Sequence, residues 1–186
     1  CGNFFNVQVE AAGKIRMELY ENGSCGNGGG LTGTTTVNDG SWHHFAVVRK
    51  SGVISIYVDG VLNTSATLST NLNNTANLKL GTNPCGNTFG GELDELRIWN
   101  VARSLEQIND FKNASLPGTT AGLLAYYDFN NPAATGGGNN VGQTTLDDRT
   151  ANNYDGTLVN FTLNNSTSNW LGNPGTTVTF YADADG

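Results

Sequence analysis

Apolar and polar residues alternate through two short segments near the start of the chain. Residues 4–10 and 14–19 both follow a period of two, and small residues separate them. This period is typical of half-buried strands, and a short link containing Ala and Gly favours a turn. The sequence therefore predicts an antiparallel hairpin, in which a three-residue turn at residues 12–14 would place Val9 opposite Met17.

The same register predicts a disulfide bond. Continued outward along both strands, it sets Cys1 opposite Cys25, and opposed residues on antiparallel strands can bring their β-carbons within bonding range. The chain has three Cys residues, so one of them is left over from any single pairing. We predict the bond between Cys1 and Cys25, with Cys25 and Cys85 as the rival pair.

Turn signals separate further apolar runs along the chain. Asp59-Gly60 lies between two of them, and an Asp-Gly pair in this position is the strongest short-range hairpin signal. The segments with strand character are residues 41–49, 53–58, 61–63, 78–81, 93–99, 123–129 and 156–163. The glycine runs at 28–30 and 136–138 lack a following Lys-Ser/Thr pair or capped helix, so they predict flexible loops.

A single helix is predicted after Ser104. Ser104 and Gln107 have the spacing of a capping box, in which each side chain bonds the backbone N–H of the other residue. Leu105, Ile108 and Phe111 then fall on one side of about two to three helical turns.

The composition agrees with an all-β domain. Charged residues make up 13% of the chain and 25 residues are Gly, which together exclude a helical bundle. Short strands separated by frequent turns predict an antiparallel β-sandwich with one short helix. A net charge of −7 argues against nucleic acid as a partner. No apolar run is long enough for membrane insertion.

Three segments of the chain resemble a known family. Residues 40–48 (GSWHHFAVV), 56–60 (IYVDG) and 91–100 (GELDELRIWN) are similar, in this order, to motifs of the laminin-G-like domain. The resemblance covers about residues 1–112 and extends to the concanavalin A-like superfamily, which also contains pentraxins and some glucanases. It implies a jelly-roll β-sandwich.

The second half resembles sequence found in large secreted proteins of Bacteroidetes-type bacteria. Residues 123–129 (LLAYYDF) and 168–170 (SNW) carry this likeness, and residues 179–186 (TFYADADG) resemble the Asp-rich repeats of surface adhesins. The resemblance implies a secreted or cell-surface protein with neighbouring domains in the same chain. We expect the sandwich at residues 1–175, with its opening strands missing, and the start of an Asp-rich linker or module at 176–186.

Two Asp-rich segments are candidates for calcium binding. The first is a loop that contains Asp147, Asp148, Asn152, Asn153 and Asp155, and the second contains Asp183 and Asp185. Calcium prefers carboxylate and amide oxygens, and Asp-x-Asp-Gly resembles the opening of a calcium loop. Members of the resembled family often bind calcium at a rim of the sandwich. The competing interpretation is that these residues only supply turn conformations.

Trp170 is the candidate for stacking on a sugar. It lies in a polar stretch, whereas Trp42 and Trp99 lie in apolar strand segments and are expected in the core. Sugar hydroxyls pair with planar amides and carboxylates, so we expect Asn152 and Asn153 to contribute to the same ligand-binding rim.

One segment is similar to the catalytic strand of glucanases with this fold. Those enzymes carry Glu-x-Asp and a further Glu on one strand face, as nucleophile and acid. Alternation in residues 92–95 (ELDE) puts Glu92 and Asp94 on one face but Glu95 on the other. The sequence therefore favours a non-catalytic module that binds a glycan or a surface protein. A structural spacer and a β-glucan hydrolase are the alternatives.

Overall fold

The computed structural model describes residues 4–20, 29–68, 75–83, 86–130, 138–164 and 169–170, and the structural statements below concern these residues. The strands are β1 (Phe4–Val9), β2 (Lys14–Tyr20), β3 (Gly29–Thr36), β4 (Phe45–Lys50), β5 (Val53–Val58), β6 (Val61–Thr67), β7 (Leu96–Trp99), β8 (Leu123–Tyr127), β9 (Thr145–Leu146) and β10 (Gly156–Thr157). The helix is α1 (Leu105–Phe111).

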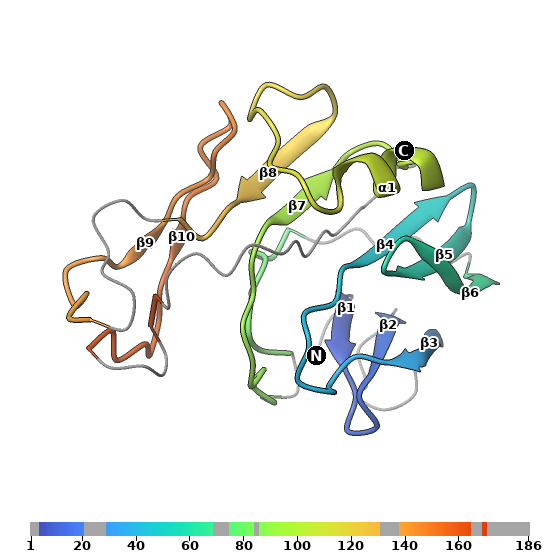
Figure 1. The fold of residues 1–186 in the computed structure, drawn as a ribbon, viewed down its shortest axis with the longest axis horizontal. Coiled ribbons are helices and arrows are strands. Elements are labelled where there is room, and N and C mark those ends of the chain that lie inside the picture. Colours follow the sequence, from blue (N-terminus) through green and yellow to red (C-terminus); the bar gives the residue numbers. More distant parts are fainter. Residues whose placement is uncertain are drawn as a thin grey trace.

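The strands pair into four antiparallel sheets (Figure 1). Two of them are three-stranded, β1-β2-β3 and β4-β5-β6, and two are pairs, β7-β8 and β9-β10. The predicted class, an all-β antiparallel fold with one short helix, is therefore confirmed. Within the described ranges, no helix is long and apolar enough to cross a membrane.

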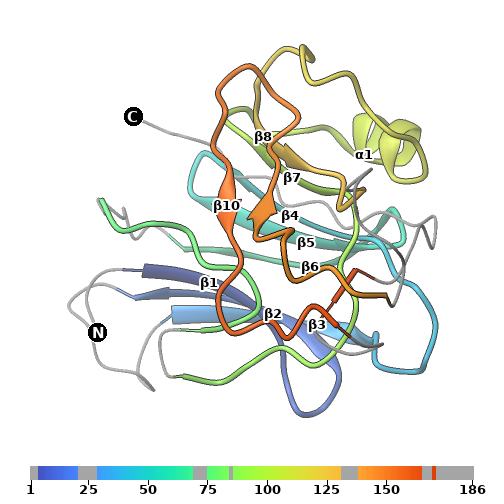
Figure 2. The same cartoon turned by 90° about the vertical axis from the view of Figure 1, so that its left-hand side faces the viewer.

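The sheets lie in layers (Figure 2), and apolar side chains pack between the β1-β2-β3 and β4-β5-β6 sheets. Ile54 and Ile56 of β5 cluster with Ile15 and Met17 of β2, and this cluster forms the core between the first two sheets. Alternation along β2 and β5 places these residues on one face of each strand. The two central strands are therefore held by burial of their shared apolar face.

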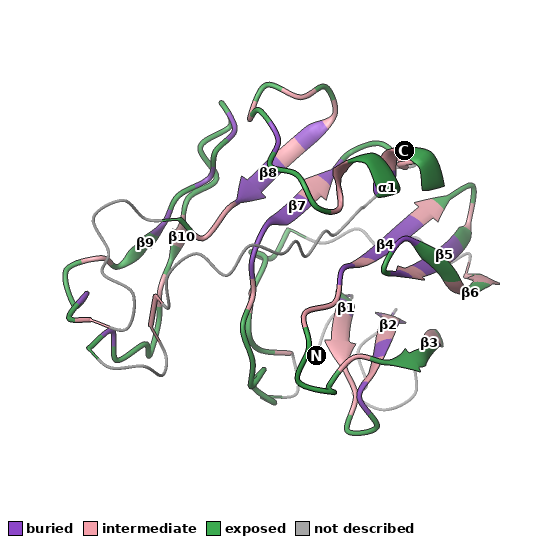
Figure 3. Cartoon of the chain, viewed as in Figure 1, coloured by how far each residue is buried: buried purple, intermediate pink, exposed green. Residues whose placement is uncertain are grey.

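The opposite face of β4 contributes to a second core. Ala46 and Val48 of β4 cluster there with Trp99 of β7 and Ile108 of α1, and the buried stretches of β4, β7 and β8 stand out in Figure 3. Trp99 is fully buried, as the sequence predicted. These contacts fix β7 and α1 against the β4-β5-β6 sheet.

The first hairpin forms, but its predicted register is wrong by two residues. Val9 lies opposite Ile15 rather than Met17, because the turn is centred one residue earlier than expected. In this turn, Gly13 has a φ of +73° and its N–H donates to the carbonyl oxygen of Glu10 (2.7 Å). The shift keeps the apolar residues on the core-facing side, since a displacement by two preserves the face.

This correction bears on the predicted disulfide. The predicted register was the geometric reason for joining Cys1 to Cys25, and the observed register removes that reason. Cys1, Cys25 and Cys85 lie outside the described residues.

The prediction that the first glycine run is a flexible loop is wrong for Gly29 and Gly30, which begin β3. A β-carbon on Gly30 would lie 2.5 Å from Nη2 of Arg16, so glycine leaves room for the guanidinium across the sheet. Residues 78–81 form no strand, and the nearest pairing is an isolated bridge between Thr82 and Thr88.

The helix begins as the capping pattern predicted. The Ser104 hydroxyl accepts from the Gln107 N–H (3.2 Å), and Gln107 Oε1 accepts from the Ser104 N–H (2.9 Å). Ile108 is buried, but Leu105 is 44% exposed, so the apolar stripe is narrower than expected.

Two adjacent histidines have opposite environments. His43 Nδ1 lies 2.8 Å from Asp59 Oδ2 and Nε2 lies 3.2 Å from Asp39 Oδ1. Hydrogen bonding to Asp59, then to Asp39, raises the pKa of His43, because both contacts favour the protonated ring.

His44 points to the other side and is only 5% exposed. Neither of its ring nitrogens has a hydrogen-bond partner among the described residues. Burial, and next the charge of Arg97, lower the pKa of His44 to about 4, while Asp59 opposes this shift and Lys112 adds to it. The fold therefore favours neutral His44 and protonated His43.

Lowering the pH is expected to destabilise the fold through the buried His44. The pKa of His44 in the folded state is near 4, below the ordinary value of 6.5. The free energy of unfolding is therefore at its full value above about pH 6.5 and falls as the pH drops, because the unfolded state takes up the proton first. Between about pH 7.5 and pH 5 this loss is about 2 kcal/mol, and His44→Leu should remove it. Urea denaturation of both proteins at the two pH values measures the difference.

The control is His43→Gln. The raised pKa of His43 gives stability that is present below its ordinary pKa and lost as the pH rises through the folded value. His43→Gln should therefore make the loss on acidification larger than in the wild type. Equal pH dependence of wild type and His44→Leu would contradict the assignment.

Candidate functional site

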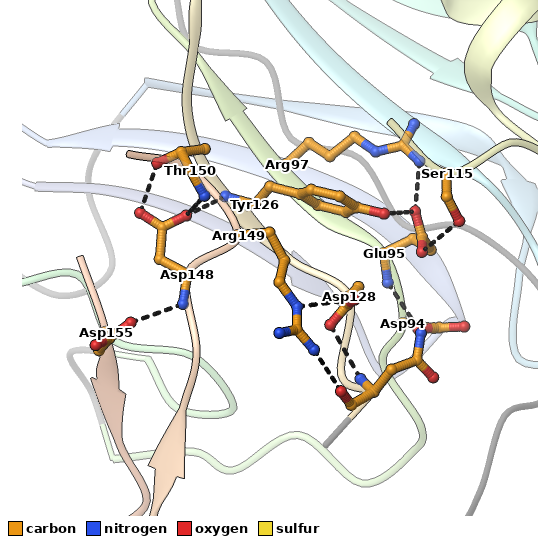
Figure 4. A network of polar contacts seen from close by, with 11 residues as sticks. Asp94, Glu95, Arg97, Ser115, Tyr126, Asp128, Asp148, Arg149, Thr150 and Asp155 are labelled. Carbon is orange, nitrogen blue, oxygen red and sulfur yellow. Dashed lines mark hydrogen bonds and ion pairs between the residues drawn. The ribbon is translucent and has the colours of Figure 1, made fainter. Parts of the chain in front are cut away.

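A buried carboxylate anchors the loop that follows β9. Asp148, 7% exposed, accepts hydrogen bonds from the N–H groups of Tyr126 (2.9 Å), Thr150 (2.9 Å) and Tyr154 (3.0 Å) and from the Thr150 hydroxyl (2.8 Å). Asp155 Oδ1 in turn accepts from the Asp148 N–H (2.8 Å), as Figure 4 shows. These bonds tie the loop to β8 and to the start of β10.

A second buried network lies on the other side of Tyr126 (Figure 4). Glu95 Oε2 accepts from Arg97 Nη2 (2.5 Å) and from the Tyr126 hydroxyl (2.7 Å), and Oε1 accepts from the Ser115 hydroxyl (3.3 Å). Burial, then the bond to Glu95, raise the pKa of Tyr126 to about 12. Tyr126 therefore links both networks, through its backbone to Asp148 and through its hydroxyl to Glu95.

The strand predicted at residues 93–99 is shorter than expected. It begins at Leu96, because Glu95 has a φ of +54°, which a strand residue does not adopt. The face assignment that alternation gave to the segment 92–95 was therefore wrong. Asp94 and Glu95 are both buried, and Asp94 Oδ1 accepts from the Glu95 N–H (2.9 Å), whereas Glu92 is exposed.

A shallow surface hollow, here called the Trp170 hollow, lies between the end of β8 and the loop after β9. Its lining combines aromatic rings with carboxylate, amide and guanidinium groups: Asp128, Phe129, Asn130, Leu146, Asp147, Arg149 and Trp170. Aromatic surface with a few placed polar groups is the usual composition of a small-ligand site.

The polar side of the hollow is held by Arg149. Its Nε lies 2.9 Å from Asp128 Oδ2, and its Nη2 donates to the carbonyl oxygen of Asn130 (2.5 Å). Asp128 Oδ1 also accepts from the Asn130 N–H (3.1 Å). These contacts fix the turn at residues 128–130.

The aromatic side carries backbone strain. Phe129 has a φ of +49°, an uncommon value for a bulky residue, and such strain costs about 1–3 kcal/mol. Phe129 and Trp170, both partly buried, pack against the cluster that contains Leu146. The Trp170 backbone N–H donates to Asn169 Oδ1 (2.8 Å), which orients the residue.

The structure brings only some of the sequence-predicted residues together. Trp170 and Asp147 both line the hollow, whereas Asp148 and Asp155 hold the loop from within. Asn152 Nδ2 donates to the carbonyl oxygen of Leu124 (2.8 Å).

Asn153 bonds within its own turn, donating to the carbonyl oxygen of Ala151 (3.3 Å). Asp183 and Asp185 lie outside the described residues. In the described ranges, no three acidic, His or Cys side chains converge as metal ligands, and calcium binding stays a prediction.

The sequence did not predict five of the lining residues: Asp128, Phe129, Asn130, Leu146 and Arg149. For three of them the local signal is the polar Asp-Phe-Asn turn directly after the apolar run of β8.

A family model described as the concanavalin A-like lectin/glucanases superfamily, of the laminin-G-like type, matches residues 1–109. The chain belongs to this superfamily. The resemblance predicted from the three motifs is confirmed, and the Trp170 hollow lies outside the matched residues. No curated protein matches the chain.

Two solved structures are similar to this member of the superfamily. A Bacteroides ovatus protein, provisionally named a carbohydrate-binding protein, is 19% identical, with a TM-score of 0.61 over 82% of this chain and 44% of that one. An S-layer domain-containing protein from Clostridium thermocellum is 20% identical, with a TM-score of 0.38 over 59% of this chain and 56% of that one. The chain thus spans less than half of the Bacteroides protein, whose likeness confirms the fold.

Asp148→Ala tests the anchor of the rim. It would leave three N–H groups and a hydroxyl without their acceptor, so we expect a loss of about 2–4 kcal/mol in unfolding free energy. Asp147→Ala removes an exposed neighbouring carboxylate and should change stability by less than about 0.5 kcal/mol. Urea denaturation compares the two, and equal losses would show that Asp148 is no anchor.

Proposed function

We propose that this chain is a non-catalytic carbohydrate-binding module of an exported cell-surface protein, and that the Trp170 hollow receives the glycan. The observation that carries the proposal is the meeting of Trp170 and Phe129 with Asp128, Asn130 and Asp147 around one shallow hollow of the surface. Membership of a superfamily of lectins and glucanases supports it, as does the name given to the Bacteroides protein.

The chemistry of the lining suits a sugar ring. The C–H face of a pyranose is apolar and stacks on an aromatic ring such as Trp170, while its hydroxyls need hydrogen-bond partners. The Asn130 amide can donate and accept, and the Asp147 carboxylate accepts from hydroxyls. Both side chains are exposed, so a ligand can reach them from solvent.

The carboxylates favour binding without hydrolysis. Glycosidases need a pair of carboxyl groups flanking the scissile bond, about 5–9.5 Å apart, with one free to attack or to activate water. Asp128 is paired with Arg149, and Glu95 bonds Arg97, Tyr126 and Ser115. These carboxylates are engaged in hydrogen bonds and ion pairs within the fold, which supports a binding role without catalysis.

Trp170→Ala should weaken glycan binding. We expect an oligosaccharide selected on a glycan array to bind the variant at least about tenfold more weakly, a change of about 1.4 kcal/mol. Isothermal titration measures it. Tyr154→Ala is the matched control, because it removes a 59%-exposed aromatic ring that does not line the hollow.

Trp170 also packs on a core cluster, so its replacement tests folding as well as binding. A second variant separates the two effects. Asn130→Ala removes an exposed amide from the hollow and should weaken the same glycan while the melting temperature stays at the wild-type value. A chain that binds no glycan on the array would favour the structural spacer. Release of reducing sugar from a bound β-glucan would favour the hydrolase.

The proposal also includes stabilisation by calcium, with Asp183 and Asp185 as ligands. The sequence alone supports this part of the proposal. A cation that binds only the folded state, at about 100 times its dissociation constant, stabilises by about 2.7 kcal/mol. We therefore expect the melting temperature to rise by several degrees with calcium and to return with excess EDTA. Identical melting curves would remove calcium from the proposal.

A further inference from the structure

The ring of His43 bridges two turns that belong to different parts of the chain. Its Nδ1 lies 2.8 Å from Asp59 Oδ2, in the turn between β5 and β6, and its Nε2 lies 3.2 Å from Asp39 Oδ1, in the link from β3 to β4. That link connects the two three-stranded sheets. We propose that His43 is a proton-dependent clamp, which holds the turn at residues 38–41 when its ring is protonated and releases that turn when the proton is lost. The clamp does not involve the Trp170 hollow.

The number of donors on the ring decides how many carboxylates it can hold. A protonated imidazole donates from both ring nitrogens, whereas a neutral imidazole donates from one and accepts at the other. Asp39 and Asp59 can only accept when they are ionised. A neutral His43 therefore satisfies one carboxylate, and its second nitrogen turns a lone pair toward the other. Both contacts favour the protonated ring, and they raise the pKa of His43 above its ordinary value of 6.5, with Asp59 as the larger cause.

The Asp59 side of the clamp is also held by bonds that do not involve the His43 ring. Asp59 Oδ1 accepts from the His44 N–H (2.9 Å), and the Asp59 N–H donates to the carbonyl oxygen of His44 (2.7 Å). From α1, the ammonium group of Lys112 donates to the carbonyl oxygen of Asp59 (2.8 Å). The turn between β5 and β6 therefore stays in place when His43 becomes neutral.

The Asp39 side depends more strongly on His43. Asp39 Oδ1 accepts from the Ser41 N–H (2.9 Å), but this bond stays within one turn. The bond from Ser41, and next the bond from His43, lower the pKa of Asp39, so this carboxylate is ionised at neutral pH. The contact with His43 is what connects Asp39 to the turn between β5 and β6, and it is the longer of the two contacts of the ring. Neutral His43 therefore keeps Asp59 and releases Asp39.

The turn at residues 38–41 also borders the first hairpin. The Val37 N–H donates to the carbonyl oxygen of Gly13 (2.7 Å), and a β-carbon on Gly13 would overlap the side-chain amide of Asn38. The clamp thus acts where the turn of the first hairpin, the link between the sheets and the turn between β5 and β6 meet. The two adjacent histidines act in opposite directions, because His43 loosens this region at high pH and His44 destabilises the fold at low pH.

NMR titration of the histidine rings in the 186-residue chain tests the protonation step. We expect the midpoint of His43 to lie above pH 6.5. Asp39→Asn should lower this midpoint by about half a pH unit, the size expected for an exposed ion pair. Glu92→Gln removes an exposed carboxylate that does not act on His43, so it should leave the midpoint unchanged. A midpoint at or below 6.5, or one that Asp39→Asn does not move, would overturn the clamp.

Backbone order parameters of residues 39–41 test the release itself. We expect values of about 0.85 while His43 is protonated, and values below about 0.6 once the pH is well above the midpoint. His43→Gln carries no positive charge and offers one amide donor group, so it should show the low values already at pH 6. Glu92→Gln is again the control and should keep the wild-type values.

Strand β4 is the internal reference for these measurements. Its order parameters should stay at about 0.85 in every variant and at every pH, because the clamp releases one turn and leaves the sheet folded. Residues 39–41 that are equally ordered on both sides of the midpoint and in His43→Gln would show that the ring contact is only structural, and would overturn the proposal. Loss of order in β4 together with residues 39–41 would show general unfolding and would overturn it as well.

Discussion

The fully buried guanidinium of Arg97 is the charge on which the centre of the molecule depends. It is paired with Glu95, donates to the carbonyl oxygens of Phe111 and Ala114, and lies 5.2 Å from the centre of the Tyr126 ring. A buried charge that loses its partner is strongly destabilising, so these contacts must form together. They join β7, β8 and the chain that leaves α1, and they fix Tyr126 in place.

Tyr126 connects this network to the loop after β9, where the ligand-binding rim is proposed. Its hydroxyl donates to Glu95, and its backbone N–H donates to Asp148, whose other hydrogen bonds hold the loop after β9. The hollow lies between that loop and the turn after β8, so its two walls share one anchored strand. A site supported in this way is preorganised, which lowers the entropy lost when a ligand binds.

Local signals predicted most of the fold, and close contacts between distant segments decided the rest. The Asp59-Gly60 hairpin and the Ser104 cap depend on a few neighbouring residues, so both could be predicted. The strand character of Gly30 comes from its pairing with Glu18 of β2, and no local pattern encodes that pairing. The hollow combines Asp128, Asp147 and Trp170 from three separate segments. The sequence pointed to Asp147 and Trp170, but their meeting with Asp128 depends on the tertiary structure.

The segment at residues 92–95 shows how one carboxylate-rich motif can serve two purposes in a single superfamily. A glucanase needs carboxylate lone pairs facing an open cleft. In this chain, the positive φ of Glu95 turns its side chain inward, where Arg97, Tyr126 and Ser115 occupy both oxygens. Glu95 neutralises the buried arginine, and Glu92, the first residue of the motif, is exposed. Under the proposed function, recognition therefore falls to the rim, which this network supports through Tyr126.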